Sequence, residues 1–589
     1  MDASEINNNS SWIDSKKMLP NRNALPKSGK VNGGKALIEC LLAHGVDVMF
    51  GYPGGAIMPF YDELYKNSHS PYHILVRHEQ CAVHAAEGYA NITGKVGVCL
   101  ATSGPGATNL VTGIADAMLD SVPVVCITGQ VVSSLLGTDA FQEIDIIGIT
   151  IPITKWNYQI TNAEEIPYIV FKAFSLAQTG RPGPIVIDIT KDAQVGTFNW
   201  EDIDFEVPHY AYLEHPIEES HIKKTAELIN HSKRPMLLLG HGVRIAGAEN
   251  EVIELATKAG IPITSTLLGL SSCPTDHPLY AGMLGMHGNY GPNILTNEAD
   301  LLIAVGMRFD DRVTGVLSKY APHAKVIHFE IDPAEVGKIV KSDVALIGDA
   351  KEALIKLLPH VERTAHLEWL ERFRECEQVE YEQIIKDAIS PTTKRVCMSE
   401  VVSKVSQMTN GQAVVVSDVG QHQMMSARYY KFRTPKSYIT SGGLGTMGYS
   451  LPASIGAKIG APDRTVITFV GDGSFQMTIQ ELGTVAQEGI PIKVIVMNNG
   501  YLGMVRQWQE LFFDKRYAST PMKNPDYITI CKGFGIDSSR VSTRDELQTG
   551  LTALLNANGP YVLEVLVEQE ENVFPMIPSG AGVSEIRLK

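Results

Sequence analysis

One rhythm recurs in three stretches of the sequence: a short run of apolar, often β-branched residues, a glycine-rich turn, and then a segment with helical periodicity. A strand followed by a crossover helix places successive strands parallel, so this rhythm predicts open parallel sheets with helices on both faces. Because 589 residues exceed what one hydrophobic core can serve, we expect an α/β protein made of three doubly wound parallel-sheet domains. The clearest strand-like runs are Gly97–Thr102, Val122–Gly129, Pro184–Ile189, Met236–Gly240, Leu301–Gly306, Val326–Ile331, Ala413–Ser417, Val466–Gly471 and Ile492–Asn498.

The same rhythm locates the domains. We place the three domains at residues 31–195, 215–358 and 390–567. Residues 1–30 are polar and rich in Asn and Ser, so we expect a disordered tail there, and residues 568–589 form a separate C-terminal segment. The charged stretch 361–390 is expected to be a solvated connector that is helical at Leu367–Tyr381.

Charge and composition exclude two classes of partner. The net charge is −15 at pH 7, which argues against a nucleic-acid binder, because that task needs clustered Lys and Arg. No apolar run approaches the roughly 18 to 20 residues of a membrane span, so no membrane partner is expected. The eight cysteines are scattered without a CxxC pair, and the N-terminus lacks the apolar core of a secretory signal. We therefore expect reduced, mostly buried thiols in a cytoplasmic protein.

The most informative segment is Thr465–Asn499. An apolar strand over Val466–Val470 leads into the tight turn Gly471-Asp472-Gly473, and Ser474 is a candidate N-cap for the helix that follows. The next strand ends at Asn498-Asn499. Because the two strands of a βαβ unit are parallel, Asp472 and Asn499 are expected at the same carboxyl edge of one sheet, where open α/β sheets bind ligands.

This edge offers the ligands that a divalent cation prefers. Mg²⁺ takes hard oxygen ligands, usually one or two carboxylates together with phosphate oxygens. Asp472 supplies a carboxylate, Asn499 an amide oxygen and Tyr501 a backbone carbonyl. The glycines let the backbone approach phosphates, and a helix N-terminus offers free N–H groups to an anion. Asp-Gly and Asn-Gly are each ordinary turn dipeptides, but their joint spacing resembles the motif that binds thiamine diphosphate (ThDP), which implies ThDP and Mg²⁺ as cofactors.

A ThDP enzyme also needs a carboxyl group that bonds a ring nitrogen of the cofactor's aminopyrimidine. Glu79 is the candidate, since it follows the strand-like run Ile74–Val76 and precedes an alanine-rich helical segment. Taken alone, Glu79 is more simply an acid that opens a helix, where its charge suits the dipole. The resemblance to ThDP enzymes, which place their glutamate at such a junction, favours the catalytic interpretation. Nearby His78, Cys81 and His84 have metal-like spacing but drift around a helix without an evident fourth ligand.

From about residue 33 to the C-terminus, the chain resembles the catalytic subunits of acetohydroxyacid synthases. The segments that carry the resemblance include GYPGGAIMPFYDEL, ATSGPGATN, GTDAFQE, LGMHG, VGMRFDDRVTG, SGGLGTMGYSLP and NNGYLGMVRQWQE. Arg308-Phe309-Asp310-Asp311-Arg312 discriminates most, because it is similar to the biosynthetic, FAD-containing branch rather than to the catabolic acetolactate synthases. The resemblance implies the three-domain architecture of ThDP-dependent enzymes.

The resemblance also implies a reaction and partners. Such an enzyme decarboxylates pyruvate on ThDP and condenses the hydroxyethyl unit with pyruvate, giving 2-acetolactate, or with 2-ketobutyrate, giving 2-aceto-2-hydroxybutyrate, in branched-chain amino-acid biosynthesis. The resemblance implies a homodimer or tetramer that has its active site between subunits and that also binds a small regulatory subunit. Residues 568–589 would then close over the site as a lid.

Individual residues acquire roles only through this resemblance. Glu79 would activate the cofactor, Gly55 would lie over its thiazolium ring and Gln142 would lie near the acceptor. Arg312 would bind the carboxylate of the second ketoacid, and Trp508 would shape an acceptor pocket that favours 2-ketobutyrate. Without it, Arg312 is more simply a surface ion pair and Trp508 a core aromatic. The implied ThDP positions are Glu79, Val419, Gly420, Gln421, His422, Gly445, Met447, Gly471, Asp472, Gly473, Ser474, Asn499, Gly503 and Met504, and the implied metal ligands are Asp472, Asn499 and Tyr501.

The middle domain resembles the FAD domain of the same family. Gly240-His241-Gly242 follows a strand and would let the backbone meet a diphosphate, and Glu330 ends a strand, as a ribose-binding acid should. Acetolactate formation has no net redox change, so FAD would be structural. The implied FAD positions are Arg181, Gly240, His241, Gly242, Thr266, Leu267, Met286, His287, Gly306, Arg308, Asp310, Val313, Glu330, Ile331 and Asp349.

Three alternatives compete with this interpretation. A pyruvate oxidase would use ThDP and pass electrons to FAD, although RFDDR and QWQE speak against it. A FAD-dependent dehydrogenase without ThDP would leave the paired GDG and NN segments unexplained. A catalytically inactive binding subunit is disfavoured because Glu79, Asp472 and Asn499 are all present.

Overall fold

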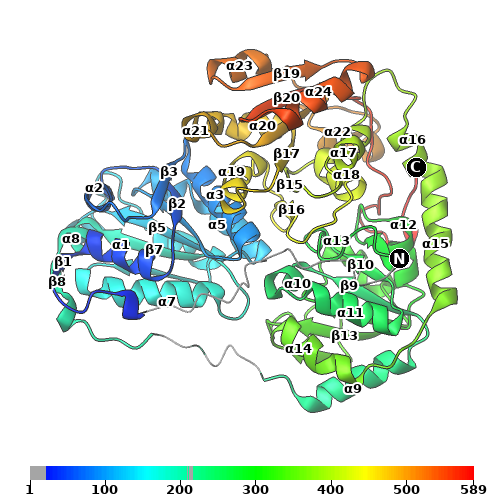
Figure 1. Ribbon diagram of the computed structural model, residues 1–589, viewed down its shortest axis with the longest axis horizontal. Helices are drawn as coiled ribbons and strands as arrows, with labels where there is room; N and C mark the ends of the chain where they lie inside the picture. Colours follow the sequence, from blue (N-terminus) through cyan, green and yellow to red (C-terminus); the bar gives the residue numbers. More distant parts are fainter. Residues whose placement is uncertain (1–21, 208–209, 211–215) are drawn as a thin grey trace.

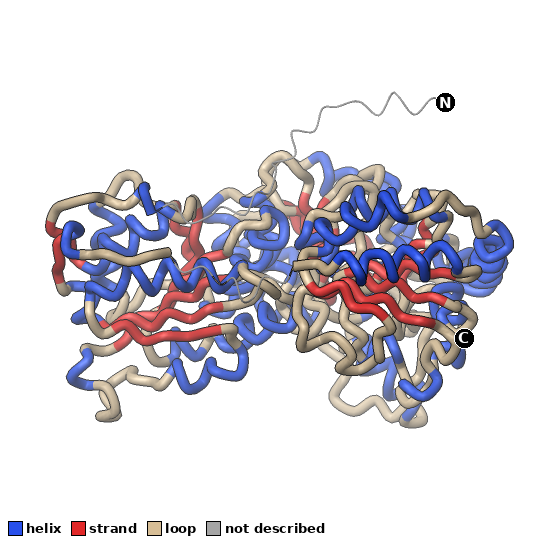
Figure 2. The backbone as a smooth tube through the Cα atoms, turned by 90° about the horizontal axis from the view of Figure 1, so that it is seen from below, coloured by secondary structure: helices blue, strands red, loops and turns tan. Residues whose placement is uncertain are grey.

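The computed structural model describes residues 22–207, 210 and 216–589. Within them, three six-stranded parallel sheets are flanked by helices on both faces (Figures 1 and 2). The prediction of three doubly wound parallel sheets is confirmed, and all nine strand-like runs lie in these sheets. Residues 1–21 of the expected N-terminal tail lie outside the described residues, whereas Lys30–Asn32 forms strand β1.

The first sheet, at the left of Figure 1, has the strand order β3-β2-β4-β5-β7-β6. Its strands are β2 (Val48–Gly51), β3 (Tyr72–Leu75), β4 (Gly97–Ala101), β5 (Val124–Gln130), β6 (Trp156–Ile160) and β7 (Ile185–Thr190). Its main helices are α1 (Gly33–Ala43), α2 (Met58–Lys66), α3 (Glu79–Thr93), α5 (Val111–Asp120) and α7 (Ile166–Gln178). The chain runs outwards from β2 to β3 and then crosses to β4, so the topological switch point, where such sheets bind ligands, lies between β2 and β4.

The second sheet has the order β11-β10-β9-β12-β13-β14 and its switch point lies between β9 and β12. Its strands are β9 (Pro235–Leu239), β10 (Ile263–Ser265), β11 (Tyr280–Met283), β12 (Leu301–Val305), β13 (Lys325–Glu330) and β14 (Val344–Ile347). Its main helices are α9 (Glu219–His231), α10 (His241–Ala246), α11 (Glu249–Ala259), α12 (Tyr290–Thr296), α13 (Asp311–Thr314) and α14 (Ala350–Leu357).

The third sheet repeats the topology of the first, with the order β16-β15-β17-β18-β20-β19, so its switch point lies between β15 and β17. Its strands are β15 (Val414–Ser417), β16 (Tyr438–Ile439), β17 (Val466–Gly471), β18 (Lys493–Asn498), β19 (Asp537–Val541) and β20 (Tyr561–Leu566). Its main helices are α17 (Met398–Met408), α18 (Gln421–Tyr429), α19 (Ser450–Gly460), α20 (Asp472–Thr478), α21 (Leu482–Glu488), α22 (Gly503–Phe512), α23 (Tyr527–Gly533) and α24 (Arg544–Asn556).

The expected solvated connector at 361–390 is a helix with one buried face. Helix α15 (Leu367–Glu380) confirms the predicted helix, but Trp369 and Phe373 pack into the core of the second sheet. Glu380 forms a buried ion pair with Arg428 of α18. Most of the stretch is exposed, as predicted for a solvated connector, whereas its few apolar residues recur at helical spacing and together cover the second sheet.

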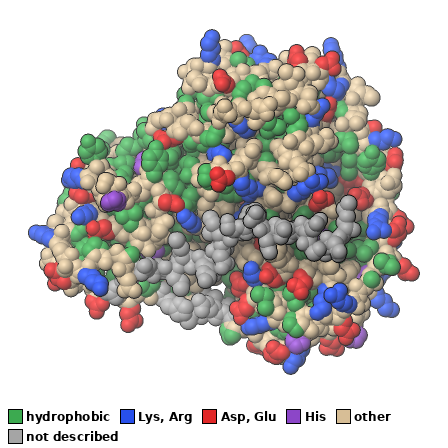
Figure 3. All heavy atoms as spheres, viewed as in Figure 1, with side chains coloured by type: hydrophobic (Ala, Val, Ile, Leu, Met, Phe, Trp, Pro, Cys, Tyr) green, Lys and Arg blue, Asp and Glu red, His purple; other side chains and the backbone are tan. Residues whose placement is uncertain are grey.

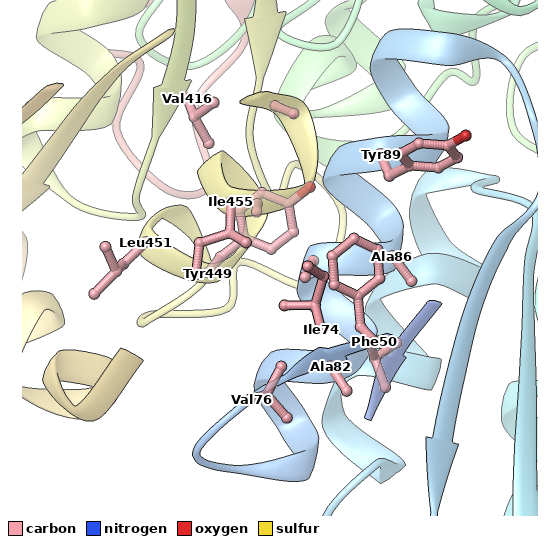
Figure 4. Close-up of a cluster of buried hydrophobic side chains, with 14 of the residues drawn as sticks. Phe50, Ile74, Val76, Ala82, Ala86, Tyr89, Val416, Tyr449, Leu451 and Ile455 are labelled. Carbon is pink, nitrogen blue, oxygen red and sulfur yellow. The ribbon is translucent and has the colours of Figure 1, made fainter. Parts of the chain in front are cut away.

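Helices α3 and α19 join the first sheet to the third. Ala82 and Ala86 of α3 belong to the same buried cluster as Tyr449, which precedes α19, and Ile455 of α19. Figure 4 shows these four side chains where the two helices meet. Small residues allow the two backbones to approach closely. A Cβ on Gly456 would collide with the carbonyl oxygen of Ala85.

We expect Gly456→Ala to destabilise the fold by about 2 kcal/mol or more, because an overpacked helix contact can be relieved only by moving backbone. Elsewhere in a helix the same substitution would be favourable by up to ~1 kcal/mol. Gly533→Ala is the matched control, since Gly533 is also helical, in α23, and nothing lies within 4 Å of its Cβ position. Thermal unfolding of both variants checks the prediction. A wild-type midpoint for Gly456→Ala would show that the two helices separate freely.

All eight cysteines lie within the described residues, where they are buried and unpaired, as expected for reduced thiols. Across the described part of the chain, none of the helices combines the length and the apolar character that a membrane crossing requires.

Candidate active site

A cavity of about 590 Å³ lies between the second and third sheets. It is lined by residues that follow β9, β12 and β13 of the second sheet and β15, β17 and β18 of the third. These positions flank the switch points of both sheets, which explains why the loops converge there. Of all the predicted site residues, only Gly55, Glu79, Gln142 and Gly240 are not part of its lining.

Asp472 and Asn499 lie at the third-sheet end of the cavity, at the same sheet edge, as the βαβ pattern predicts. Their side chains are almost fully buried, with exposed fractions of 1% and 3%. Burial raises the pKa of Asp472 to about 6, so a neighbouring cation would be needed to compensate an ionised carboxylate here. With the backbone carbonyl of Tyr501, which also lines the cavity, the donors are all oxygens and fit Mg²⁺.

The glycines around Asp472 are required by close packing. A Cβ on Gly471 would lie 2.8 Å from Cε1 of His422, and one on Gly473 would lie 2.8 Å from Cδ2 of Leu502. The Nε2 atom of His422 is buried without a hydrogen-bond partner, and burial lowers the pKa of this histidine to about 4. A neutral imidazole, an oxygen donor set and side-chain-free backbone together fit a diphosphate bound through a divalent cation.

Ser474 is not the N-cap that the sequence predicts. Helix α20 begins at Asp472, and Gly471, the last residue of β17, precedes it in an extended conformation. The helix therefore starts directly at the strand end, which leaves Ser474 inside its first turn. The Ser474 hydroxyl donates to the carbonyl of Val419, at 3.4 Å.

The second-sheet side of the cavity carries the residues assigned to FAD except Arg181, which lines the cavity from the first-sheet domain, between α7 and β7. Close backbone packing occurs at Gly242, whose Cβ would lie 2.6 Å from Cα of Gly306. Glu330 ends β13, and burial raises its pKa to about 7. Its Oε1 accepts hydrogen bonds from the N–H groups of Ile331 and Asp332, at 2.9 and 3.0 Å. Glycine packing and an acid at a strand end are what a dinucleotide requires, so this side fits FAD.

Gly240 lies behind this surface rather than on it. It precedes helix α10 as its N-cap residue, and a Cβ there would collide with Gly306 and Met307. Its position therefore serves the packing between the ends of β9 and β12.

Arg312 and Trp508 both line the cavity, although they come from different sheets. The Arg312 side chain is 64% exposed, and the one carboxylate that pairs with it among the described residues is that of its neighbour Asp311, with Nε and Oδ2 3.7 Å apart. Its guanidinium therefore keeps donors for an anionic ligand. The Trp508 ring lies on α22, tilted against Phe512 at a centroid distance of 5.1 Å.

Glu79, Gly55 and Gln142 form a separate group on the first sheet. Glu79 is the first residue of α3, and Nδ2 of Asn109 donates to its Oε2 at 2.9 Å. Gly55 is exposed with open space at its Cβ position, and Gln142 has a φ of +60° and packs against Gly104. These residues follow β2, β3 and β5, at the carboxyl edge of the sheet. Within one chain, the predicted site residues therefore fall into two groups: those that line the cavity, and Glu79, Gly55 and Gln142, which do not.

The metal-like spacing of His78, Cys81 and His84 does not bring them together. His78 accepts a hydrogen bond from the backbone N–H of Gln80 at the start of α3. His84 is buried and contacts Oε2 of Glu87 through Nδ1, at 2.7 Å. The drift around the helix that argued against a metal site is therefore observed.

The sequence did not point to Asp120, at the end of α5, which also lines the cavity. Its carboxylate accepts the backbone N–H groups of Gly442 and Gly443, each at 2.7 Å, and burial raises its pKa to about 6. An acid that ends a helix carries no local signal of a contact more than 300 residues away.

The segment 568–589, expected to be a lid, packs against the third sheet at Val573 and against the second sheet further on. Ile577 and Val583 belong to the core on that sheet, and the N–H of Ile577 donates to the carbonyl of Met286 at 2.9 Å. Among the described residues of this segment, none lines the cavity.

Three family models of thiamine pyrophosphate (ThDP) enzymes match the chain. The N-terminal TPP binding domain matches residues 31–149, the central domain matches 222–357 and the C-terminal TPP binding domain matches 418–565. They correspond to the first, second and third sheets.

Three curated proteins with similar sequences are named acetolactate synthase or its large subunit. The acetolactate synthase isozyme 2 large subunit of Escherichia coli (strain K12) is 44% identical over 95% of this chain and all of its own length. The acetolactate synthase large subunit of Corynebacterium glutamicum is 45% identical over 96% of this chain and 91% of its own length. The acetolactate synthase of Arthrospira platensis is 46% identical over 95% of this chain and 98% of its own length. The chain therefore belongs to the acetolactate synthase large-subunit family, and it is a ThDP-dependent enzyme.

Proposed function

We propose that the enzyme decarboxylates pyruvate and joins the remaining two-carbon unit to a second pyruvate, giving 2-acetolactate, or to 2-ketobutyrate, giving 2-aceto-2-hydroxybutyrate, in branched-chain amino-acid biosynthesis. The observation that carries this proposal is the meeting of two unlike sets of residues in one cavity. Asp472 and Asn499 offer a cation–diphosphate site, and Arg312 and Trp508 offer a carboxylate site beside an aromatic wall.

The cofactors follow from the two sides of the cavity. Asp472, Asn499 and the carbonyl of Tyr501 would hold Mg²⁺, and the diphosphate of ThDP would lie against the backbone of Gly471 and Gly473, which line the cavity. ThDP, when bound, supplies the electron sink for decarboxylation. The loops around Gly242 and Glu330 would hold FAD in a structural role, because the proposed reaction leaves no electrons to accept.

Glu79, Gly55 and Gln142 require a second copy of the chain in this proposal. In one chain these residues do not line the cavity, so we infer that they complete the cavity of a partner subunit in a homodimer or tetramer. Large apolar side chains support such an interface, since Phe141 and Ile151 of the first sheet are 88% and 65% exposed. Figure 3 also shows hydrophobic side chains gathered on the visible face where the first and third sheets meet.

Other parts of the proposal rest on relatives and composition. Several relatives are named large subunits, which supports a small regulatory partner for this chain too. The eight unpaired, buried cysteines support a reducing compartment, so we assign the enzyme to the cytoplasm.

A product assay tests the proposed reaction. Incubation with pyruvate, ThDP, Mg²⁺ and FAD should yield 2-acetolactate, and addition of 2-ketobutyrate should yield 2-aceto-2-hydroxybutyrate. A pyruvate oxidase would instead reduce FAD and form acetate without acetolactate, and that outcome would overturn the proposal.

We expect Arg312→Ala to raise the KM for the acceptor ketoacid roughly 10- to 100-fold, because the loss of a charged hydrogen-bond donor costs about 1.5–3 kcal/mol. Arg312→Lys keeps the charge but loses the planar fork, so its KM should be intermediate. Steady-state kinetics with 2-ketobutyrate at saturating pyruvate measure the effect. The control is Arg374→Ala, an exposed arginine on α15. An unchanged KM would leave Arg312 as a surface residue.

A further inference from the structure

Asn524 lies beside the metal end of the third sheet, although it belongs to the segment that precedes α23. Its Nδ2 donates to Oδ2 of Asp472 at 2.6 Å and to Oδ1 of Asn498 at 2.8 Å. Its Oδ1 accepts from Nε2 of Gln476 at 2.9 Å. Because Gln476 occupies the acceptor end of the amide, the donor end must face Asp472.

Backbone pairing holds Asn524 in this place. Residues 500–502, which follow β18, run antiparallel to residues 520–522, with Met522 N–H donating to the Gly500 carbonyl at 2.8 Å and Leu502 N–H donating to the Thr520 carbonyl at 3.0 Å. The intervening residues include α22, which carries Trp508. The chain therefore returns to the strand end after making one wall of the cavity.

The hydrogen bonds on Asp472 are unequally distributed. Asn524 Nδ2 and the N–H of Gly500 both donate to Oδ2, at 2.6 and 3.0 Å. Among the described residues, no side chain donates to Oδ1. Tyr527 holds the backbone of the same residue, since its hydroxyl donates to the Asp472 carbonyl at 3.0 Å. The backbone N–H groups of Asp472 and Gly473 also bond the Asp472 carboxylate. The side-chain donor Asn524 is thus on Oδ2, and a cation at Oδ1 would displace no side chain among the described residues.

We propose that Asn524 is a positioning residue for the divalent cation: it ties Oδ2 of Asp472 and thereby leaves Oδ1 for a cation that this end of the cavity would hold. The inference rests on the proposed function, because it takes Asp472 to be a metal ligand. Groups that hydrogen-bond to metal ligands typically change metal affinity about 10- to 100-fold when they are removed. Asn524 does not line the cavity, so its action on substrate is indirect.

The test compares Asn524→Leu, which keeps a similar size without a donor, and Asn524→Ala with the wild-type enzyme. ThDP binding is measured by isothermal titration calorimetry at graded Mg²⁺ concentrations, and kcat and the KM for pyruvate are measured at saturating ThDP and Mg²⁺. The Mg²⁺ concentration for half-maximal ThDP binding should rise roughly 10- to 100-fold in both variants, while kcat and KM should stay near the wild-type values. Asn556→Leu, an exposed asparagine that ends α24, is the control.

Gln476→Leu provides a second measurement if the Asn524 variants unfold. It leaves Asn524 in place but removes the donor that fixes the amide, so a smaller rise in the required Mg²⁺ is expected. Wild-type Mg²⁺ dependence in the folded Asn524 variants, or a loss of kcat that saturating Mg²⁺ does not restore, would overturn the inference. Absence of Mg²⁺-dependent ThDP binding in the wild-type enzyme would instead overturn the proposed cofactor site itself.

Discussion

Glu79→Gln is expected to lower kcat for acetolactate formation by roughly 10²- to 10⁴-fold, the range for loss of a group that exchanges a proton. The amide has nearly the shape of the carboxyl group but cannot hold or release the proton that the aminopyrimidine requires. ThDP binding should change little, because Asp472 and Asn499 lie in the separate cavity lining. Product formation and calorimetric ThDP binding in the same preparations measure the two effects.

Glu79→Asp separates this role from that of a helix-opening acid. Asp keeps the negative charge at the first position of α3, where it interacts favourably with the helix dipole by about 0.3–1 kcal/mol, but its carboxyl group is one methylene shorter. We expect low activity in this variant as well, with a nearly unchanged unfolding temperature. Full activity in both variants would leave Glu79 as a helix-opening residue that accepts a hydrogen bond from Asn109.

The sheets and half of the site could be predicted because their signals are local. A run such as Val466–Gly471 is apolar apart from Thr468 because its strand is buried on both faces, and Gly471 and Gly473 mark the strand end. Parallel pairing of β17 with β18 then brings Asp472 and Asn499 to one edge without further information.

The contacts that were missed join parts of the chain far apart in sequence. Asn524 contacts Asp472 only because residues 500–502 pair with 520–522. Asp120, at the end of α5 beside the first sheet, contacts Gly442, which follows β16 of the third sheet. Such contacts need as little as one hydrogen-bonding side chain, since Gly442 contributes only its backbone N–H, and they impose no periodicity. The buried Glu380–Arg428 pair is similar, since each residue lies in a segment that reads as polar surface. The location of Glu79 outside the cavity also has no local signal, because the residues around Glu79 do not indicate which distant loops line the cavity.

Two inactive variants are expected to restore activity to each other. Asp472→Ala removes a buried oxygen ligand and should abolish metal-dependent ThDP binding, and Glu79→Gln should be inactive for the reason given above. If the first-sheet group of one subunit completes the cavity of the other, a hybrid dimer contains one doubly altered site and one intact site. Random pairing makes half of the dimers hybrids, so about a quarter of the wild-type activity should return.

Co-expression of the two variants with different affinity tags, followed by purification through both tags, measures this recovery directly. The hybrids isolated in this way should have about half of the wild-type activity per dimer, because one of their two sites is intact. Two differently tagged copies of Glu79→Gln, purified identically, are the control and should stay inactive. A site built within one chain predicts no recovery in any mixture, because every chain then carries a defect in its own site. Recovery therefore distinguishes a shared site from a single chain that closes its first sheet onto its own cavity.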